Sequence, residues 1–404
     1  MNSARRFLAA AALAAVAACA TSGNGTASRV DAPGRGGSDG GTARTEGPLL
    51  YVTNQDGASV SVIHVESRGI VARVDLQAMG FGPQAKPHDT AVEPDGSFWY
   101  VSLIGENRVL KLDDENRLIG QVEMEVPGLV VIHPTEDLLL VGRSMTAVNP
   151  PSSVAVVRRS DMTLLEEIEV IYPRPHALQI RPQGDRAYSA SLADNRMAVI
   201  EPVEGEVELI DVPTGAPAHA MTDTTDHMAH AGADTTDHAA HTPHTMVDFA
   251  MAPDGRTMVA GGELSGELLV FDLADPAAPR VVRTVALGGA PWHAAFTPDG
   301  QWVYVPLHLA NAVAVVDAST WEVVARIEGR GLAQPHAAVT SPDGRSVFVS
   351  NNNTGGEYVP EGPEPEAGTV VVIDVATREI VDVIEVGPNP TGLEIGPARR
   401  APGR

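Results

Sequence analysis

The chain has 404 residues, of which 52 are acidic, 28 are lysine or arginine and one is cysteine, and its formal charge is −24. A hydrophobic content of 43% is enough for a folded core and excludes a globally disordered chain. The acidic excess argues against binding to nucleic acid or to anionic lipid headgroups, because both need a basic surface. A single cysteine excludes a disulfide framework and an iron–sulfur cluster, and the missing Cys-x-x-Cys-His motif excludes covalent c-type haem.

The first 19 residues are typical of an export signal. Arg5 and Arg6 supply the positive start, and an apolar run too short to span a bilayer follows them. The run ends in Val-Ala-Ala-Cys at 16–19, which resembles the bacterial lipobox, whose cysteine is lipidated and becomes the mature N-terminus. We therefore expect 1–19 to be a lipoprotein signal peptide and Cys19 to anchor the protein in the cell envelope, at the outer membrane, the periplasmic face or the cell surface. The export route, Sec or twin-arginine, stays open.

Residues 20–47 are rich in Gly, Ser and Thr and predict a flexible tether. Seven self-similar segments follow, and each has a proline six residues after a point that we call position zero. Four of these prolines begin a Pro-Asp-Gly hairpin turn, at 94–96, 253–255, 298–300 and 342–344. The residues at position zero are His88, Gly128, His176, Val247, Trp292, His336 and Thr391.

Each repeat contains four short runs of alternating apolar residues, which is typical of one propeller blade. The runs at 49–54, 59–63 and 70–74 lack a first strand, and 392–395 is a first strand without successors. We therefore predict an all-β fold, a seven-bladed β-propeller of four-stranded antiparallel blades over 48–397, with the ring closed by both termini. Residues 398–404 are expected to form a disordered tail.

The Tyr-Val-Thr-Asn run at 51–54, the repeated Pro-Asp-Gly turns and the Val-Val-Val-Ile-Asp ending at 370–374 resemble the YVTN-type seven-bladed β-propeller family. The resemblance covers 48–397 and implies the fold. Its function is not implied, because relatives include binding scaffolds, surface proteins and enzymes. The chain is more distantly similar to the propeller domains of nitrous-oxide reductase and copper-containing methanethiol oxidases, which use propeller histidines to bind copper. Some lactonases share the fold as well.

In a propeller, the loops that join fourth to first strands and second to third strands lie on one face, which we call the top face. Eleven of the 13 histidines are expected there. Asp89 and Asp248 are expected to assist them as auxiliary ligands, and the alternative is that the channel-mouth histidines are structural. The candidate metal ligands are His88, His176, His293, His308, His336, His219, His227, His230, His238, His241 and His244.

Six of these histidines belong to an insertion at 213–246, between the third and fourth blades. It contains a tandem repeat with His227 and His230 in one copy and His238 and His241 in the other. The His-x-x-His spacing puts two imidazoles on one side of a helical turn, and nearby methionines favour copper. The alternative is a low-complexity loop without a function.

Three functions follow from this pattern. The first is a binding or scaffold protein with a top face that binds a transition metal, copper or zinc, and an unknown partner protein. The second is a metal-sequestering or metal-delivery protein, and the third is a copper-dependent oxidoreductase with its metal at the channel mouth. The sequence shows neither a nucleophile constellation nor a phosphate-binding loop, so we assign no catalytic residue and no nucleotide cofactor. The chain is expected to be a monomer that contacts the membrane through Cys19 and does not bind nucleic acid.

Overall fold

The structure is a computed structural model and describes residues 47–145, 149–213 and 243–397. The predicted signal peptide with Cys19, residues 20–46 of the predicted tether, residues 214–242 of the insertion and the tail at 398–404 lie outside the described residues. Expectations about those segments therefore stay predictions.

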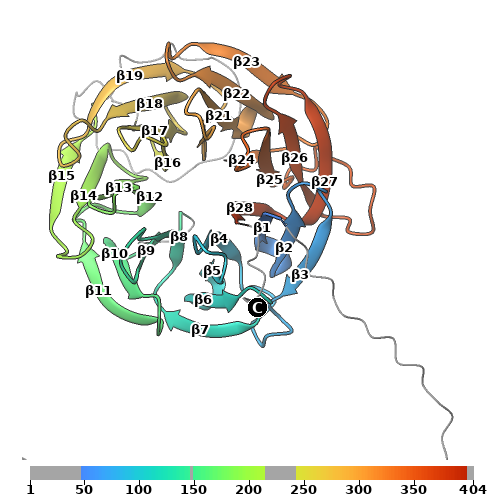
Figure 1. Cartoon of the computed structure of the whole chain (residues 1–404), viewed down its shortest axis with the longest axis horizontal. Helices are drawn as coiled ribbons and strands as arrows, with labels where there is room; N and C mark the ends of the chain where they lie inside the picture. The colour runs from blue at the N-terminus through green and yellow to red at the C-terminus, as the bar shows by residue number, and fades with distance from the viewer. Residues whose placement is uncertain (1–46, 146–148, 214–242, 398–404) are drawn as a thin grey trace, which may run out of the picture. The chain divides into compact units, whose positions relative to one another are not determined.

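The described residues form seven four-stranded antiparallel sheets arranged as a ring around a central channel (Figure 1). This confirms the predicted all-β seven-bladed propeller. Blades 1 to 6 are each built from four consecutive strands, beginning with β4–β7 and ending with β24–β27. Blade 7 has the order β28-β1-β2-β3, so that strands from the two ends of the described chain share one sheet.

The strands fall into four classes by their place in a blade. The first strands line the channel and are β4 (Pro87–Val92), β8 (Pro127–Ile132), β12 (Pro175–Ile180), β16 (Met246–Met251), β20 (Ala295–Phe296), β24 (Pro335–Thr340) and β28 (Pro390–Gly396). The second strands are β5 (Phe98–Leu103), β9 (Leu138–Arg143), β13 (Ala187–Ser191), β17 (Thr257–Gly262), β21 (Trp302–Leu307), β25 (Ser346–Asn351) and β1 (Leu49–Asn54). The third strands are β6 (Arg108–Asp113), β10 (Ser153–Arg158), β14 (Arg196–Ile200), β18 (Glu267–Asp272), β22 (Ala312–Asp317), β26 (Ala367–Asp374) and β2 (Ser59–His64). The fourth strands form the rim and are β7 (Leu118–Glu123), β11 (Thr163–Glu169), β15 (Val207–Asp211), β19 (Arg280–Ala286), β23 (Val323–Glu328), β27 (Ile380–Pro388) and β3 (Ile70–Asp75).

Burial follows the place of each strand. Second and third strands such as β1 and β2 are buried along their whole length, because neighbouring blades cover both of their faces. Fourth strands such as β3 expose most of their residues. The blades adhere through apolar side chains, as where the Tyr51 ring of blade 7 lies 4.9 Å from the Trp99 ring of blade 1.

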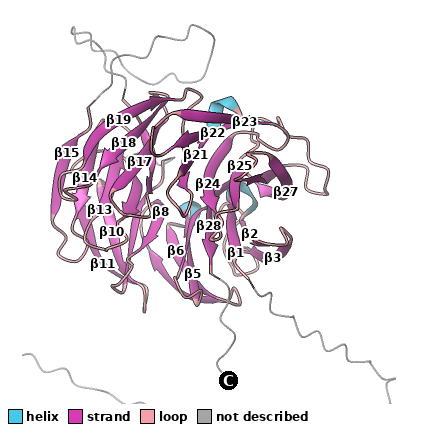
Figure 2. Cartoon of the chain, turned by 45° about the horizontal axis from the view of Figure 1, so that its top comes forward, coloured by secondary structure: helices cyan, strands magenta, loops and turns pink. Residues whose placement is uncertain are grey.

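Helical structure is confined to three short turns among the described residues, which Figure 2 colours cyan. They are η1 (Gln55–Gly57), η2 (Ile104–Glu106) and η3 (His308–Ala310), and each joins a second strand to a third strand on the top face. No helix in the described part of the chain has the length and apolar character needed to cross a membrane.

The predicted Pro-Asp-Gly turns close the opposite face. In blade 1, the Asp95 Oδ1 atom accepts a hydrogen bond from the Ser97 amide at 2.9 Å, and Gly96 has φ +72°. A residue with a side chain rarely adopts this backbone conformation, so the glycine is needed for the tight turn.

Blade 7 closes the ring with side-chain hydrogen bonds as well as strand pairing. Strand β1 pairs with β2 on one side and with β28 on the other. The Thr391 hydroxyl donates to the His88 carbonyl at 2.8 Å, and the Thr53 hydroxyl donates to the same carbonyl at 2.9 Å. The closing strand is thereby tied directly to the first strand of blade 1.

Candidate functional site

The innermost strands are irregular at their top ends. Their register against the second strand shifts between Pro87 and Thr90 in blade 1 and between Pro335 and Ala337 in blade 6, with similar shifts in blades 2, 3, 4 and 7. Such bulges bend a strand and redirect the side chain at the extra residue. Position zero falls inside these shifts, and His88 and His336 occupy it in blades 1 and 6.

Four histidines meet at the channel mouth. The His88 ring centre lies 5.7 Å from that of His176 and 6.2 Å from that of His336. The His293 ring centre lies 6.4 Å from that of His176 and 4.8 Å from that of His336. We call His88, His176, His293 and His336 the histidine ring. All four are buried, with exposed fractions of 0 to 7%.

Hydrogen bonds fix three of these imidazoles in one tautomer. The Nδ1–H group of His88 donates to the Gln55 amide oxygen at 2.9 Å, and that of His176 donates to the Arg143 carbonyl at 2.7 Å. The Nδ1–H group of His293 donates to Asp248 Oδ2 at 2.9 Å. In each of the three, Nε2 then carries a lone pair, and none of these buried Nε2 atoms has a hydrogen-bond partner.

His336 completes the set, because its buried Nδ1 atom also has no hydrogen-bond partner. Burial holds the pKa of His88 and of His336 well below the usual value, and it lowers the pKa of His176 to about 4. The neighbouring imidazoles add to the effect on His88 and His336, since two positive charges so close together repel. At neutral pH these three imidazoles are uncharged, and each has a buried ring nitrogen without a hydrogen-bond partner.

Blade 5 brings its histidine into the ring by an unusual route. Its first strand β20 has only two residues, and His293 lies before it, in a parallel bridge with Ala337 of blade 6. The His293 amide donates to the His336 carbonyl at 3.3 Å, and the Ala338 amide donates to the His293 carbonyl at 3.0 Å. His293, at position one of its repeat, therefore takes the place that position zero predicted for Trp292.

Trp292 and His308 lie beside the ring instead of within it. The Trp292 ring packs edge-on against His336, with centres 4.8 Å apart, and stacks on His308 at 4.1 Å and 7°. His308 Nδ1 bonds the Pro335 carbonyl at 3.3 Å, and burial lowers the pKa of His308. The structure thus does not bring the predicted ligand His308 together with the other four.

His244 is also separate from the ring. Its Nε2 atom bonds the Pro213 carbonyl at 2.9 Å, so it joins the two described ends that flank the insertion. The remaining predicted ligands, His219, His227, His230, His238 and His241, lie outside the described residues. Within the part of the chain that the structure describes, no three His, Cys, Asp or Glu side chains are already placed to hold one metal ion.

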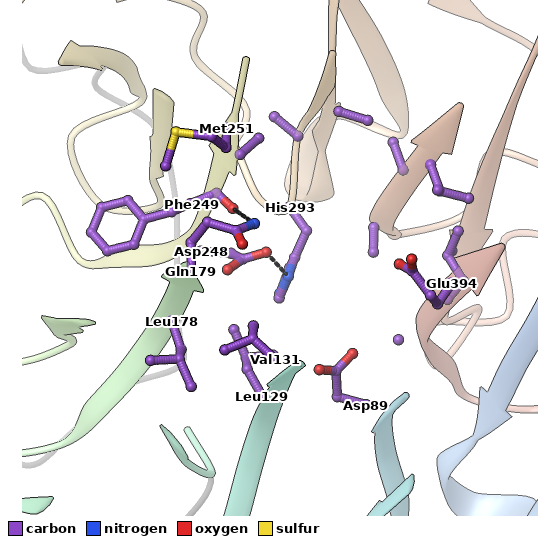
Figure 3. Close-up of a pocket in the computed structure, with 18 of the residues that line it drawn as sticks. Asp89, Leu129, Val131, Leu178, Gln179, Asp248, Phe249, Met251, His293 and Glu394 are labelled. Atoms are coloured by element: carbon purple, nitrogen blue, oxygen red, sulfur yellow. Dashed lines mark hydrogen bonds and ion pairs between the residues drawn. The ribbon is translucent and has the colours of Figure 1, made fainter. Parts of the chain in front are cut away.

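A cavity of about 270 Å³ lies below the ring, along the first strands (Figure 3). His293 extends into it, and three carboxyl groups line it, Asp89, Asp248 and Glu394. Burial raises the pKa of Asp89 to about 7 and that of Glu394 to about 8, and each carboxylate is further disfavoured by an acidic neighbour. Asp89 also accepts the Val130 amide at 2.8 Å.

Sequence reasoning found Asp89 and Asp248 but missed Glu394. The signal was available, because Glu394 stands three residues after position zero, where the other repeats have Ala91, Val131, Gln179, Ala250, Ala295 and Val339. A single carboxylate at a repeat position that is otherwise mostly apolar indicates that this residue has a local function. Gln55, which orients His88, had no such signal, because it belongs to a top-face turn.

Comparison with known proteins agrees with this architecture. Residues 115–377 match the model of the family described as "Lactonase, 7-bladed beta-propeller". The chain belongs to this family. A search of curated proteins found no match.

Solved structures show the same fold at low sequence identity. A functionally unknown protein from Desulfotomaculum acetoxidans DSM 771 is 14% identical and has a TM-score of 0.63, and the match covers 86% of this chain and 98% of that one. Kuenenia stuttgartiensis hydrazine synthase is 17% identical with a TM-score of 0.59, covering 84% and 99%. The dihydro-heme d1 dehydrogenase NirN in complex with DHE is 14% identical with a TM-score of 0.56, covering 86% and 74%. These likenesses concern the fold alone.

Proposed function

We propose that this propeller is an exported, lipid-anchored protein that binds one transition-metal ion, copper in preference to zinc, in the histidine ring. The observation that carries the proposal is the set of four buried ring nitrogens without hydrogen-bond partners. Leaving a buried polar atom unpaired costs free energy, so four of them at one place indicate a missing partner. Neutral imidazole is the most common metal-ligating side chain, and its affinity for divalent metals peaks at copper.

The spacing of the rings supports this proposal. With metal–nitrogen bonds of about 2 Å, imidazole ring centres around one ion lie roughly 4.5–6 Å apart. Neighbouring centres in the histidine ring are 4.8 to 6.4 Å apart. Asp248, Gln55 and the Arg143 carbonyl would hold the ligands by the other ring nitrogen, as is usual around protein metals.

The test is metal analysis of the soluble form that lacks residues 1–19. We expect one copper per chain by mass spectrometry after dialysis, and nitrogen couplings in the electron paramagnetic resonance (EPR) spectrum of the Cu(II) form. His176→Ala should remove this copper, while deletion of 214–242 should leave it in place. The deletion removes five other histidines, so it separates the ring from the insertion. A chain that binds no copper at micromolar concentration would refute the metal proposal.

A second function, docking of a partner protein on the top face, has separate support. Four large apolar side chains stand 60 to 78% exposed in top-face loops, Ile171, Leu264, Leu309 and Val359. Large exposed apolar side chains in the loops of one face favour an interaction surface on that face. Leu309→Ser with Val359→Ser should weaken cross-linking to a partner in the cell envelope. Val203→Ser is the matched control, because Val203 is 54% exposed on the opposite face.

Lipid anchoring is tested independently. Cys19→Ser should move the protein from the detergent phase to the aqueous phase when cell envelopes are partitioned, because the lipid would be absent. The YVTN-type resemblance and the similarity to nitrous-oxide reductase and methanethiol oxidase stay predictions from the sequence.

A further inference from the structure

We propose that a second cavity, at the junction of blades 6 and 7 on the top face, binds a lysine or arginine side chain of a partner protein. This inference rests on the proposed docking of a partner on the top face, and it names the chemistry by which that partner is recognised. The cavity has a volume of about 530 Å³, and its wall contains none of the ring histidines. It can therefore be tested without a metal.

Two parts of the chain that are far apart in sequence form this cavity. One is the loop that joins β25 to β26 in blade 6, which we call the acidic loop (residues 352–366). The other consists of Asp56 in η1 and the connection between β27 and β28 at Asn389. The Asn389 Nδ2 amide donates to Asp56 Oδ2 at 2.9 Å, so these two wall residues hold each other in place.

Side-chain hydrogen bonds fix the conformation of the acidic loop. Asn353 Nδ2 donates to the Tyr358 carbonyl at 2.8 Å, and Asn353 Oδ1 accepts the Tyr358 amide at 2.9 Å. The side-chain oxygen of Gln334 accepts the Thr354 hydroxyl and the Gly355 amide, both at 2.8 Å. The cavity is thus formed before a partner arrives, which lowers the entropy cost of binding.

One buried acceptor in the cavity wall lacks a donor. Asn352 lines the cavity and is only 6% exposed. Its Nδ2 amide donates to the Pro390 carbonyl at 2.8 Å, and no group in the described part of the chain donates to its Oδ1 atom. Leaving a buried amide oxygen without a donor costs free energy, so this atom favours a ligand that brings an N–H group.

The charges of the cavity favour a cation as that donor. Asp56 and Glu366 line it, and none of the described residues in its wall is lysine, arginine or histidine. The acidic loop contains four glutamates and no basic residue. The nearby Arg330 is paired with Glu361 at 2.6 Å and is not part of the wall. A lysine or arginine side chain supplies both the N–H donors and the positive charge.

The rest of the wall fits the carbon chain of such a side chain. Val359, Pro360, Pro365 and Pro388 line the cavity as well. Lysine and arginine bury their methylene groups against apolar surface and keep the charged end near water and acidic groups. Val359 is also one of the exposed apolar side chains of the proposed docking surface, so the cavity adjoins that surface.

The experiment is an NMR titration of the isotope-labelled, metal-free soluble form that lacks residues 1–19. The probe is a short blocked peptide with one central lysine, and its counterpart has norleucine, which keeps the carbon chain without the charge. The lysine peptide should shift the amide signals of Gly355 and Gly356 in a saturable way. The norleucine peptide should bind at least about tenfold more weakly, because it makes no charged contact.

Two double variants separate the cavity from the overall charge of the protein. Asp56→Asn with Glu366→Gln removes both carboxylates of the wall and keeps a side-chain oxygen for the Asn389 amide. This variant should weaken binding of the lysine peptide at least about tenfold. The matched control is Glu357→Gln with Glu364→Gln, which removes two charges from the same loop outside the wall. It should stay within about twofold of the wild type at an ionic strength of about 0.15 M.

Equal affinity for the two peptides would refute the inference, as would equal losses in the two double variants. Calcium chloride that shifts the same amide signals and displaces the peptide would show an ion site instead and would also refute it. If the lysine peptide does not bind but Leu309→Ser with Val359→Ser still weakens cross-linking, this inference is wrong and the docking function stands. Unchanged cross-linking in that variant would count against the docking function, and the peptide titration would still decide on the cavity.

Discussion

Asp248 accepts the Nδ1 proton of His293 across 2.9 Å and so links the first strand of blade 4 to the start of blade 5. The contact sets which imidazole nitrogen faces the other three histidines. It also pairs one carboxylate oxygen of Asp248 with an imidazole rather than with a lysine or arginine. Asp248 is therefore a positioning residue for the candidate metal site.

Removing this contact should weaken metal binding. Asp248→Ala frees the His293 ring to rotate and to change tautomer, so we expect copper affinity to fall about 10- to 100-fold. A competition titration with a chelator of known affinity measures the change. Glu208→Ala, on the exposed rim, should leave the affinity unchanged. An Asp248→Ala protein with wild-type affinity would show that His293 is not a ligand.

Trp292 should report on the site by fluorescence. Its ring centre lies 4.8 Å from that of His336, so bound Cu(II) should quench its emission. We expect Trp292→Phe to remove most of the copper-dependent quenching. Trp321→Phe should retain it, because Trp321 packs in an apolar cluster between strands rather than at the ring. Equal quenching in both variants would place the copper elsewhere.

Glu394 should make the metal-free protein less stable as pH rises. The folded-state pKa of Glu394 is raised from 4.5 to about 8, first by burial and then by Asp89. Between those pH values the folded chain keeps a proton that the unfolded chain has released, so the free energy of unfolding falls with rising pH. Glu394→Gln should therefore be more stable than the wild type by about 1–3 kcal/mol at pH 8 and nearly equal at pH 4.

Urea unfolding at both pH values measures this difference. The residue is half-buried, so solvent moderates the effect. A stability difference that does not change between pH 4 and pH 8 would contradict the prediction.

Ring closure should depend on Thr391. Its hydroxyl donates to the His88 carbonyl at 2.8 Å, and replacing it with the similar shape of valine leaves one hydrogen bond unmade at a buried place. Thr391→Val should lower the free energy of unfolding by about 1–2 kcal/mol. Thr377→Val, on an exposed turn, should change it by less than about 0.5 kcal/mol. Denaturant unfolding followed by circular dichroism compares the two variants.

The fold could be predicted from the sequence because its signals repeat. Four Pro-Asp-Gly turns and seven equivalent strand patterns predict the number of blades. The first strand that is missing at the start and stands alone at the end predicts the closure. Such signals are local, so they can be recognised in the sequence without knowledge of tertiary contacts.

The site was less accessible to sequence reasoning because it depends on irregularities. Repeat alignment put Trp292 in the ring and His293 one residue away from it, and the two-residue strand β20 reverses the two roles. His308 has the residue type of a ligand, but stacking on Trp292 takes it away from the ring. A repeat pattern describes what blades share, whereas this site arises where one blade differs from the others.

The hydrogen bond from Thr391 to His88 spans 303 residues of sequence. During synthesis, the strand that carries His88 emerges long before the strand that holds its carbonyl in place. A nascent chain therefore has no finished channel mouth, whatever blades it has already formed. Metal capture by the proposed site would thus be delayed until the last strand has docked, and an ion could not be trapped in a half-built ring.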